Sequence, residues 1–160
     1  MSWVPTTASG ATEMDRVFGL APGIYDRYLD MERAVWDPPP VDPMLLELAR
    51  LRIAQLLRAS GDQRLRTTAA VDAGLDEEKV AALRNWPTSP LFSEAERAVL
   101  SFAEVYLMDP HAVDDEQCAR LNACFSGHEL AGLSIALAIF DAITRFRLAL
   151  GIQPEPGSEL

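Results

Sequence analysis

Residues 43–59 read PMLLELARLRIAQLLRA, and their leucines recur at the spacing of one helix face. Asp42 precedes the stretch as a suitable N-cap, and Pro43 suits the first helical position, where a backbone N–H has no intrahelical partner. The spacing predicts a helix that begins at Pro43 and ends at about Ala59. This part of the chain is therefore expected to be helical rather than β.

Helical spacing also dominates the sequence on both sides of this stretch, and no segment alternates apolar and polar residues over a strand length. Ser93 and Glu96 match a capping box, and Gly151 is a suitable C-terminal glycine. The further predicted helices cover residues 13–18, 22–36, 60–73, 76–85, 93–108, 114–125 and 129–150. We expect one all-α domain of about seven or eight helices over residues 1–152, with a loose N-terminus at 1–12 and a polar tail at 153–160.

The composition is that of a globular domain, with 160 residues, 49% apolar and 24% charged. The net charge of −10 repels phosphate backbones and anionic lipids, so neither nucleic acid nor a membrane is an expected partner. The first ten residues show no leader pattern, and the longest apolar-rich stretch, residues 130–140, is too short to span a bilayer. A cytoplasmic protein is the resulting expectation.

The two cysteines, Cys118 and Cys124, fall in one predicted helix. Six residues of helix separate them by roughly 9 Å along the axis, which exceeds the disulfide limit of about 7 Å between Cα atoms. Two unpaired thiols suit a reducing compartment, and we interpret both as small buried hydrophobes.

The predicted helix at residues 129–150 is apolar on most of its faces. Such a helix is enclosed on all sides, so it is either the central helix of the domain or one that another subunit covers. A homo-oligomer (dimer, trimer or hexamer) is therefore expected.

Three segments, taken in order and spacing, resemble the carboxymuconolactone decarboxylase and alkylhydroperoxidase D-like family. They are residues 46–57 (LELARLRIAQLL), residues 74–86 followed by 91–100, and residues 139–152. The resemblance covers roughly residues 40–152 and implies the multi-helix bundle of alkylhydroperoxidase D.

The peroxidase branch of this family carries C-x-x-C-x-x-x-H, with a glutamate twelve residues before the first cysteine. Counted back from Gly74, the histidine position is Arg66, and the cysteine positions are Ala59 and Asp62. The glutamate position is Glu47, which is present. Because disulfide chemistry needs two thiols, an alkylhydroperoxidase-type thiol peroxidase is the least favoured function.

The substituted positions are themselves charged. Asp62 and Arg66 are spaced i, i+4 and would face one another on a helix, and Glu47 would approach from the preceding helix if the family fold holds. Two carboxylates can divide acid and base roles, and a guanidinium can hold a substrate carboxylate or enolate. Glu47, Asp62 and Arg66 are thus the catalytic candidates of a cofactor-independent lyase, isomerase or decarboxylase acting on a small anionic or carbonyl molecule.

The competing interpretation is a catalytically degenerate protein of the same fold that only binds or assembles. In that case Asp62 and Arg66 form a solvated ion pair of little energetic weight, and Glu47 is structural.

His128 and Arg58 are weaker candidates for substrate binding, since a basic stretch within an acidic protein attracts an anionic substrate. The two histidines, His111 and His128, lie seventeen residues apart with no ligand spacing around either. Neither a metal nor a cofactor is expected.

Overall fold

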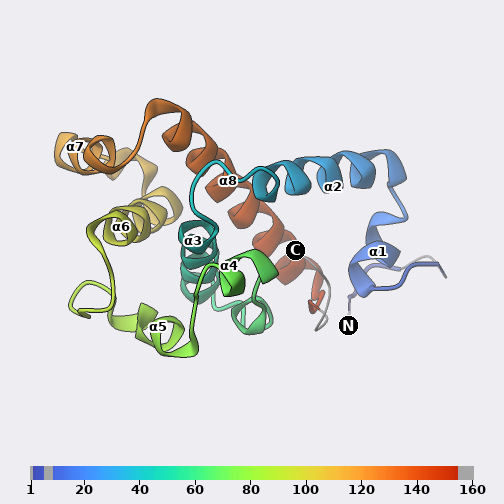
Figure 1. Ribbon diagram of the computed structural model, residues 1–160. Coiled ribbons are helices and arrows are strands. Elements are labelled where there is room, and N and C mark those ends of the chain that lie inside the picture. The colour runs from blue at the N-terminus through green and yellow to red at the C-terminus, as the bar shows by residue number, and fades with distance from the viewer. Residues whose placement is uncertain (1, 6–8, 155–160) are drawn as a thin grey trace.

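The computed structural model describes residues 2–5 and 9–154, which contain helices and no strand. Its eight α-helices are drawn in Figure 1: α1 (Glu13–Phe18), α2 (Pro22–Trp36), α3 (Pro43–Leu56), α4 (Thr68–Asp72), α5 (Glu77–Ala82), α6 (Glu94–Met108), α7 (Asp115–Cys124) and α8 (Gly127–Leu150). Three 3₁₀ segments join them: η1 (Asp62–Arg64), η2 (Leu83–Asn85) and η3 (Pro110–Ala112). The all-α prediction is confirmed.

The central helix of the domain is α3, which packs against α4, α6 and α8. It begins as predicted, with the Asp42 carboxylate accepting from the Met44 amide at 2.8 Å and Pro43 at the first position. Its apolar residues between Leu46 and Ile53 are buried on every side, and burying each leucine or isoleucine contributes about 1.5–3 kcal/mol. Two charged residues of this part of α3, Glu47 and Arg50, are buried with them.

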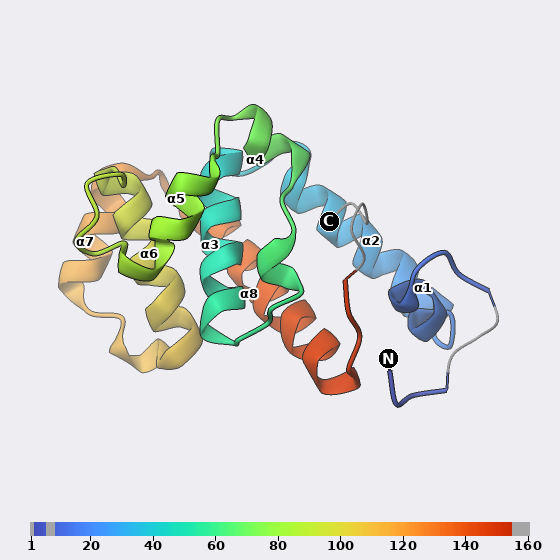
Figure 2. The ribbon, with the colours of Figure 1, turned by 90° about the horizontal axis from the view of Figure 1, so that it is seen from below.

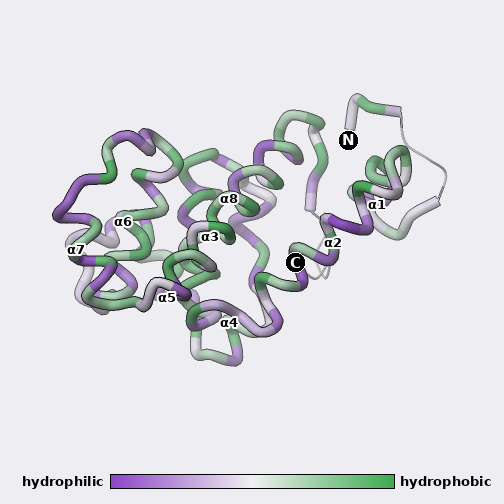
Figure 3. Tube along the Cα trace, turned by 90° about the horizontal axis from the view of Figure 1, so that it is seen from above, coloured by the Kyte–Doolittle hydropathy of each residue, from purple (hydrophilic) through white to green (hydrophobic). Residues whose placement is uncertain are grey.

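The long helix α8 runs beside α3 (Figure 2) and ends at Gly151, whose φ of 70° is readily adopted only by glycine. One face of α8 is buried, whereas Ile135 on the other face is 57% exposed. Apolar residues continue along its length (Figure 3). The first explanation for its apolar composition is therefore wrong: α8 is not the enclosed central helix of this chain.

The segment after α3 departs from the predicted helix over residues 60–73. Arg58 takes a left-handed φ of 57°, which ends α3, and only η1 and the short α4 are helical beyond it. Between them Leu65 and Thr67 are extended, with ψ values of 149° and 141°. Since residues 62 and 66 do not share one helix, the i, i+4 argument fails here.

The helix boundaries predicted from capping residues agree closely with the structure. Ser93 and Glu96 form the predicted capping box, and Asp114 caps α7. The start of α8 is the exception, because the helix begins at Gly127, two residues before the predicted start: Ser126 caps α8 and Glu129 completes a capping box. His128 is consequently helical, and it is exposed.

Helices α1 and α2 extend from one end of the molecule (Figures 1 and 2). Phe18 of α1 stacks on Tyr25 and Tyr28 of α2 and on Phe146 of α8, with ring centroids 4.7–5.4 Å apart. This aromatic cluster holds α2 against the C-terminal half of α8.

The N-terminal residues were expected to be loose, yet Trp3 donates from Nε1 to the Ala149 carbonyl at 2.8 Å. In the predicted tail, the Gln153 amide donates to Glu13 at 3.2 Å. The parts of these two predictions that concern residues 1, 6–8 and 155–160 fall outside the described residues.

Candidate functional site

A buried ion pair lies in the middle of α3, between Glu47 and Arg50. The Arg50 guanidinium donates from Nε to Glu47 Oε2 at 2.8 Å and from Nη2 to Oε1 at 2.6 Å, and both side chains are almost fully buried. The i, i+3 spacing places them on one helix face. The fork geometry gives two parallel charge-assisted hydrogen bonds, the strongest arrangement for this pair.

The same pair holds the segment that follows η1. Arg50 also donates to the carbonyls of Asp62 at 3.1 Å and Leu65 at 2.9 Å. Thr67 donates to Glu47 from its backbone amide and its hydroxyl, each at 3.3 Å. The four hydrogen bonds that Glu47 accepts fix the extended backbone of residues 65–67, and with it the position of Asp62.

A second buried ion pair joins Asp62 to Arg147 of α8. Asp62 Oδ1 lies 3.1 Å from Arg147 Nη1, and the two side chains are only 5% and 7% exposed. Arg147 Nε is also buried and has no hydrogen-bond partner among the described residues. A buried guanidinium N–H without an acceptor is costly, so this donor is an unusual feature of the pair.

Glu32 and Tyr28 of α2 form the remaining part of this cluster. The Tyr28 hydroxyl donates to the Glu32 carboxylate one helical turn away. Burial raises the pKa of Glu32, while the bond from Tyr28 and the charge of Arg147 act in the opposite direction. Burial and the neighbouring Glu32 likewise raise the pKa of Tyr28. Arg147 is therefore close to two carboxyl groups, one ion-paired and one held toward its neutral form.

The structure corrects the predicted grouping of Glu47, Asp62 and Arg66. Arg66 turns away from Asp62 and binds Glu77 of α5 in bidentate fashion, at 2.9 and 3.0 Å. Glu77 is 77% exposed, so this pair is at the surface. Arg147 takes the place next to Asp62 that the sequence prediction assigned to Arg66.

Arg147 and Glu32 were missed because each is distant from Asp62 in the sequence. A signal for Arg147 did exist: it lies one turn after Thr144 and two turns after Phe140, on the apolar face of a helix. A buried-face arginine is rarely left unpaired. Glu32 gives no comparable signal, since α2 is polar on much of its surface.

His128 and Arg58 are not brought to this cluster. His128 begins α8 and Arg147 lies near its other end, nineteen residues on, which is about 28 Å along the axis. Arg58 is exposed at the end of α3. Within the described residues, no group of three or more His, Cys, Asp and Glu side chains is arranged to hold a metal ion.

The two cysteines are exposed on α7, which corrects the prediction that they are buried. Of the two cysteine positions that the resemblance implies, Ala59 is buried and offers no reactive group, and Asp62 is the ion-paired carboxylate. No helix in the described part of the chain is both long and apolar enough to cross a membrane.

The family model for carboxymuconolactone decarboxylase matches residues 22–105, just over half of the chain. The chain belongs to the carboxymuconolactone decarboxylase family. The matched range contains Glu32, Glu47 and Asp62, whereas Arg147 lies beyond it.

Similar proteins agree with this assignment. YnjA of Escherichia coli, an uncharacterized protein, is 31% identical over 113 residues, which are 71% of this chain and 62% of YnjA. The chain thus matches less than two thirds of the length of this relative.

Two solved structures share the fold. Atu0492 of Agrobacterium tumefaciens, a protein of unknown function suggested to be an antioxidant defence protein AhpD, has a TM-score of 0.76 and 19% identity, covering 88% of this chain and 97% of that one. The debrominase Bmp8, solved with 2,3,4-tribromopyrrole, has a TM-score of 0.77 and 20% identity, covering 90% of this chain and 77% of that one. At this identity they show the alkylhydroperoxidase D-like fold alone.

Proposed function

We propose that this family member is a cofactor-independent acid–base enzyme, a lyase, isomerase or decarboxylase that acts on a small anionic or carbonyl-containing molecule. The observation that carries the proposal is the group formed by the buried Asp62 and Arg147 and the half-buried Glu32, in which one guanidinium lies near two carboxyl groups and retains an unused N–H.

The two carboxyl groups suit different steps of such a reaction. Asp62 is ion-paired to Arg147, and an ion pair requires the carboxylate form, which can accept a proton. Burial raises the pKa of Glu32 and favours its neutral form, which can donate a proton. The free Nε–H of Arg147 can donate to the carboxylate or enolate oxygen of a substrate.

Glu47 acts in this proposal as a positioning residue. Its hydrogen bonds to Arg50 and Thr67 are already formed, so it holds the backbone next to Asp62 in place rather than meeting the substrate. Arg66 also helps to position this segment, because its bond to Glu77 at the surface ties the segment to α5. His128, at the opposite end of α8 from Arg147, and Arg58, exposed after α3, have no role in this proposal.

A degenerate protein that only binds or assembles is the second candidate, and the closed ion pairs favour it. Glu47 is saturated by its partners, and a buried pair such as Asp62–Arg147 can be structural. A thiol peroxidase is least favoured, because Cys118 and Cys124 are exposed on α7 and the family's cysteine positions carry no thiol. If the parent protein reduced peroxide and the Cys118→Ser, Cys124→Ser double variant did not, the thiol peroxidase would become the favoured function.

Turnover of a panel of small aromatic and lactone acids, followed by mass spectrometry, tests the enzyme proposal. We expect a converted compound whose rate falls by about 10²-fold or more in Asp62→Asn and Glu32→Gln, the usual weight of a proton-transfer group. Asp141→Asn is the matched control, since Asp141 pairs with Arg145 at the surface of α8. Binding without conversion would support the degenerate candidate, and full activity in both site variants would remove these residues from the mechanism.

We also propose that the protein is a cytoplasmic homo-oligomer. The exposed apolar face of α8 around Ile135 supports a subunit contact there. Two free thiols support a reducing compartment.

A further inference from the structure

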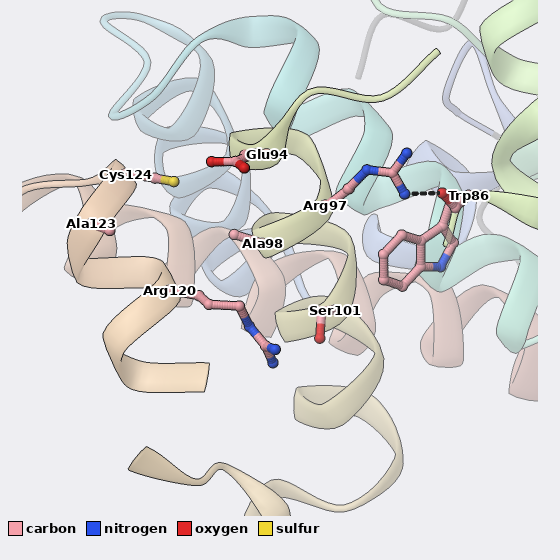
Figure 4. Close-up of a pocket in the computed structure, with 8 residues that line it drawn as sticks. All are labelled: Trp86, Glu94, Arg97, Ala98, Ser101, Arg120, Ala123 and Cys124. Atoms are coloured by element: carbon pink, nitrogen blue, oxygen red, sulfur yellow. Dashed lines mark hydrogen bonds between the residues drawn. The ribbon is translucent and has the colours of Figure 1, made fainter. Parts of the chain in front are cut away.

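A cavity of about 400 Å³ lies between α6 and α7, apart from the cluster of Glu32, Asp62 and Arg147 (Figure 4). This volume is within the range of about 300–1,000 Å³ that small-molecule sites occupy. The lining residues are Trp86, Glu94, Arg97, Ala98, Ser101, Arg120, Ala123 and Cys124. None of them takes part in the function proposed above.

The cavity is preformed because hydrogen bonds hold its walls in place. Ala98 and Ala123 are small side chains on facing helices and leave the space between them open. The Trp86 indole is fixed at one wall by its Nε1–H, which donates to Glu104 at 2.6 Å. Arg97 donates to the Trp86 carbonyl at 2.7 Å and so holds the backbone of the same loop. A ligand would find this space without first ordering it.

The two ends of the cavity differ in charge. In Figure 4 the Arg120 guanidinium and the Ser101 hydroxyl lie at one end, and Glu94 and Cys124 lie at the other. The Ser101 oxygen accepts from the buried Gln117 amide at 3.3 Å, which leaves its own proton to donate. One end therefore offers two donors to an anion, and the other end carries the Glu94 carboxylate. Arg97, which also lines the cavity, donates to the backbone carbonyls of Trp86, Pro87 and Ser89.

Arg120 is available to a ligand because its present partner holds it weakly. Its ion pair with Glu116 is 52% and 77% exposed, and a solvated pair is exchanged at little cost. We propose that this cavity binds a small planar aromatic carboxylate, with the ring against Trp86 and the carboxylate on Arg120 and Ser101. Guanidinium is suited to this task, because it can bind a carboxylate through two hydrogen bonds.

Cys124 reports on occupancy, and Cys118 on the same helix is an internal control. Both thiols are exposed, but only Cys124 lines the cavity. Alkylation by iodoacetamide is followed at each cysteine by mass spectrometry, with 2-naphthoate as the ligand and the uncharged 2-naphthylmethanol as its control. With 2-naphthoate at ten times its Kd, mass action slows alkylation of Cys124 about tenfold. The rate at Cys118 is expected to stay the same, and 2-naphthylmethanol is expected to protect much less.

Calorimetric titration of variants then locates the carboxylate and the ring. Arg120→Gln removes the charge-assisted hydrogen bonds and should weaken the Kd for 2-naphthoate about tenfold or more. Arg145→Gln is the matched control, because Arg145 belongs to a similarly exposed i, i+4 pair on α8 and does not line the cavity. Ala123→Leu fills the cavity from an exposed position, so it should abolish binding while leaving the fold intact, as circular dichroism can verify.

Five results would overturn the proposal, four of them from the binding experiments. These four are no binding of 2-naphthoate at millimolar concentration, equal protection of both cysteines, equal effects of Arg120→Gln and Arg145→Gln, and unchanged binding in a folded Ala123→Leu variant. A Cys124 that is inert to iodoacetamide in the free protein would also contradict it, because the cavity would then be covered by another subunit.

Discussion

Replacing Arg147 by methionine should destabilise the protein far more than replacing Arg145, two residues earlier on the same helix. Both arginines form ion pairs, with N–O distances of 3.1 Å for Arg147–Asp62 and 2.6 Å for Arg145–Asp141. The pairs differ mainly in burial. The side chains of the first are 7% and 5% exposed, and those of the second are 54% and 26% exposed.

Burial sets the expected magnitudes. Removing one partner of a buried ion pair leaves an uncompensated charge, here Asp62, and costs about 3–5 kcal/mol. A solvated pair contributes at most about 1 kcal/mol. For a domain of this size each kcal/mol corresponds to about 2–4 °C in Tm, so Arg147→Met should lower Tm by roughly 6–20 °C. Arg145→Met should lower it by no more than about 4 °C.

Urea and thermal unfolding followed by circular dichroism measure both variants at pH 7. The double variant Asp62→Asn, Arg147→Met completes a double-mutant cycle, because removing both charges leaves neither one buried without a partner. It should be more stable than the sum of the single changes predicts, with a coupling energy of about 1–3 kcal/mol.

Equal losses in Arg147→Met and Arg145→Met would refute this reasoning, since burial would then have no energetic consequence. Additivity in the cycle would refute it in a different way. It would show that Asp62 and Arg147 do not interact in solution, and the site proposed above would lose its central contact.

Three further predictions concern other parts of the structure. The raised pKa of Glu32 means that the folded state binds its proton more tightly than the unfolded state does, so stability falls as the pH rises through the folded-state pKa. Glu32→Gln should abolish that fall and gain stability relative to the parent at pH 8 but not at pH 4, and parallel stability–pH curves for the two proteins would contradict this. Arg50→Met should lower the free energy of unfolding in urea by about 3–5 kcal/mol, because it leaves Glu47 buried without a partner, whereas Arg66→Met should lower it by about 1 kcal/mol. The reverse order would show that Arg66, and not Arg50, makes the structural ion pair. Light scattering at micromolar concentration should show an oligomer that Ile135→Asp dissociates, and a monomeric parent would argue against a subunit contact on α8.

Local sequence signals predicted most helix boundaries well, and the reason is visible at particular caps. Ser93, Asp42 and Gly151 act on the residues within one turn of themselves, so their effect is readable without the rest of the chain. The failure came between Arg58 and Thr67. There the backbone follows the hydrogen bonds of Arg50 and Glu47 rather than helix propensity.

The amino-acid sequence by itself determined the all-α class, the capped helices, the loss of the family's thiols and the retention of Glu47. Each of these depends on residue identity or on spacing within a few turns of helix. Only the tertiary structure decided which charges meet. Asp62 pairs with Arg147, eighty-five positions away, because α3 and α8 pack side by side, while Arg66 turns outward to Glu77. The packing of apolar helix faces brings these two buried charges together, and no local sequence pattern predicts that contact.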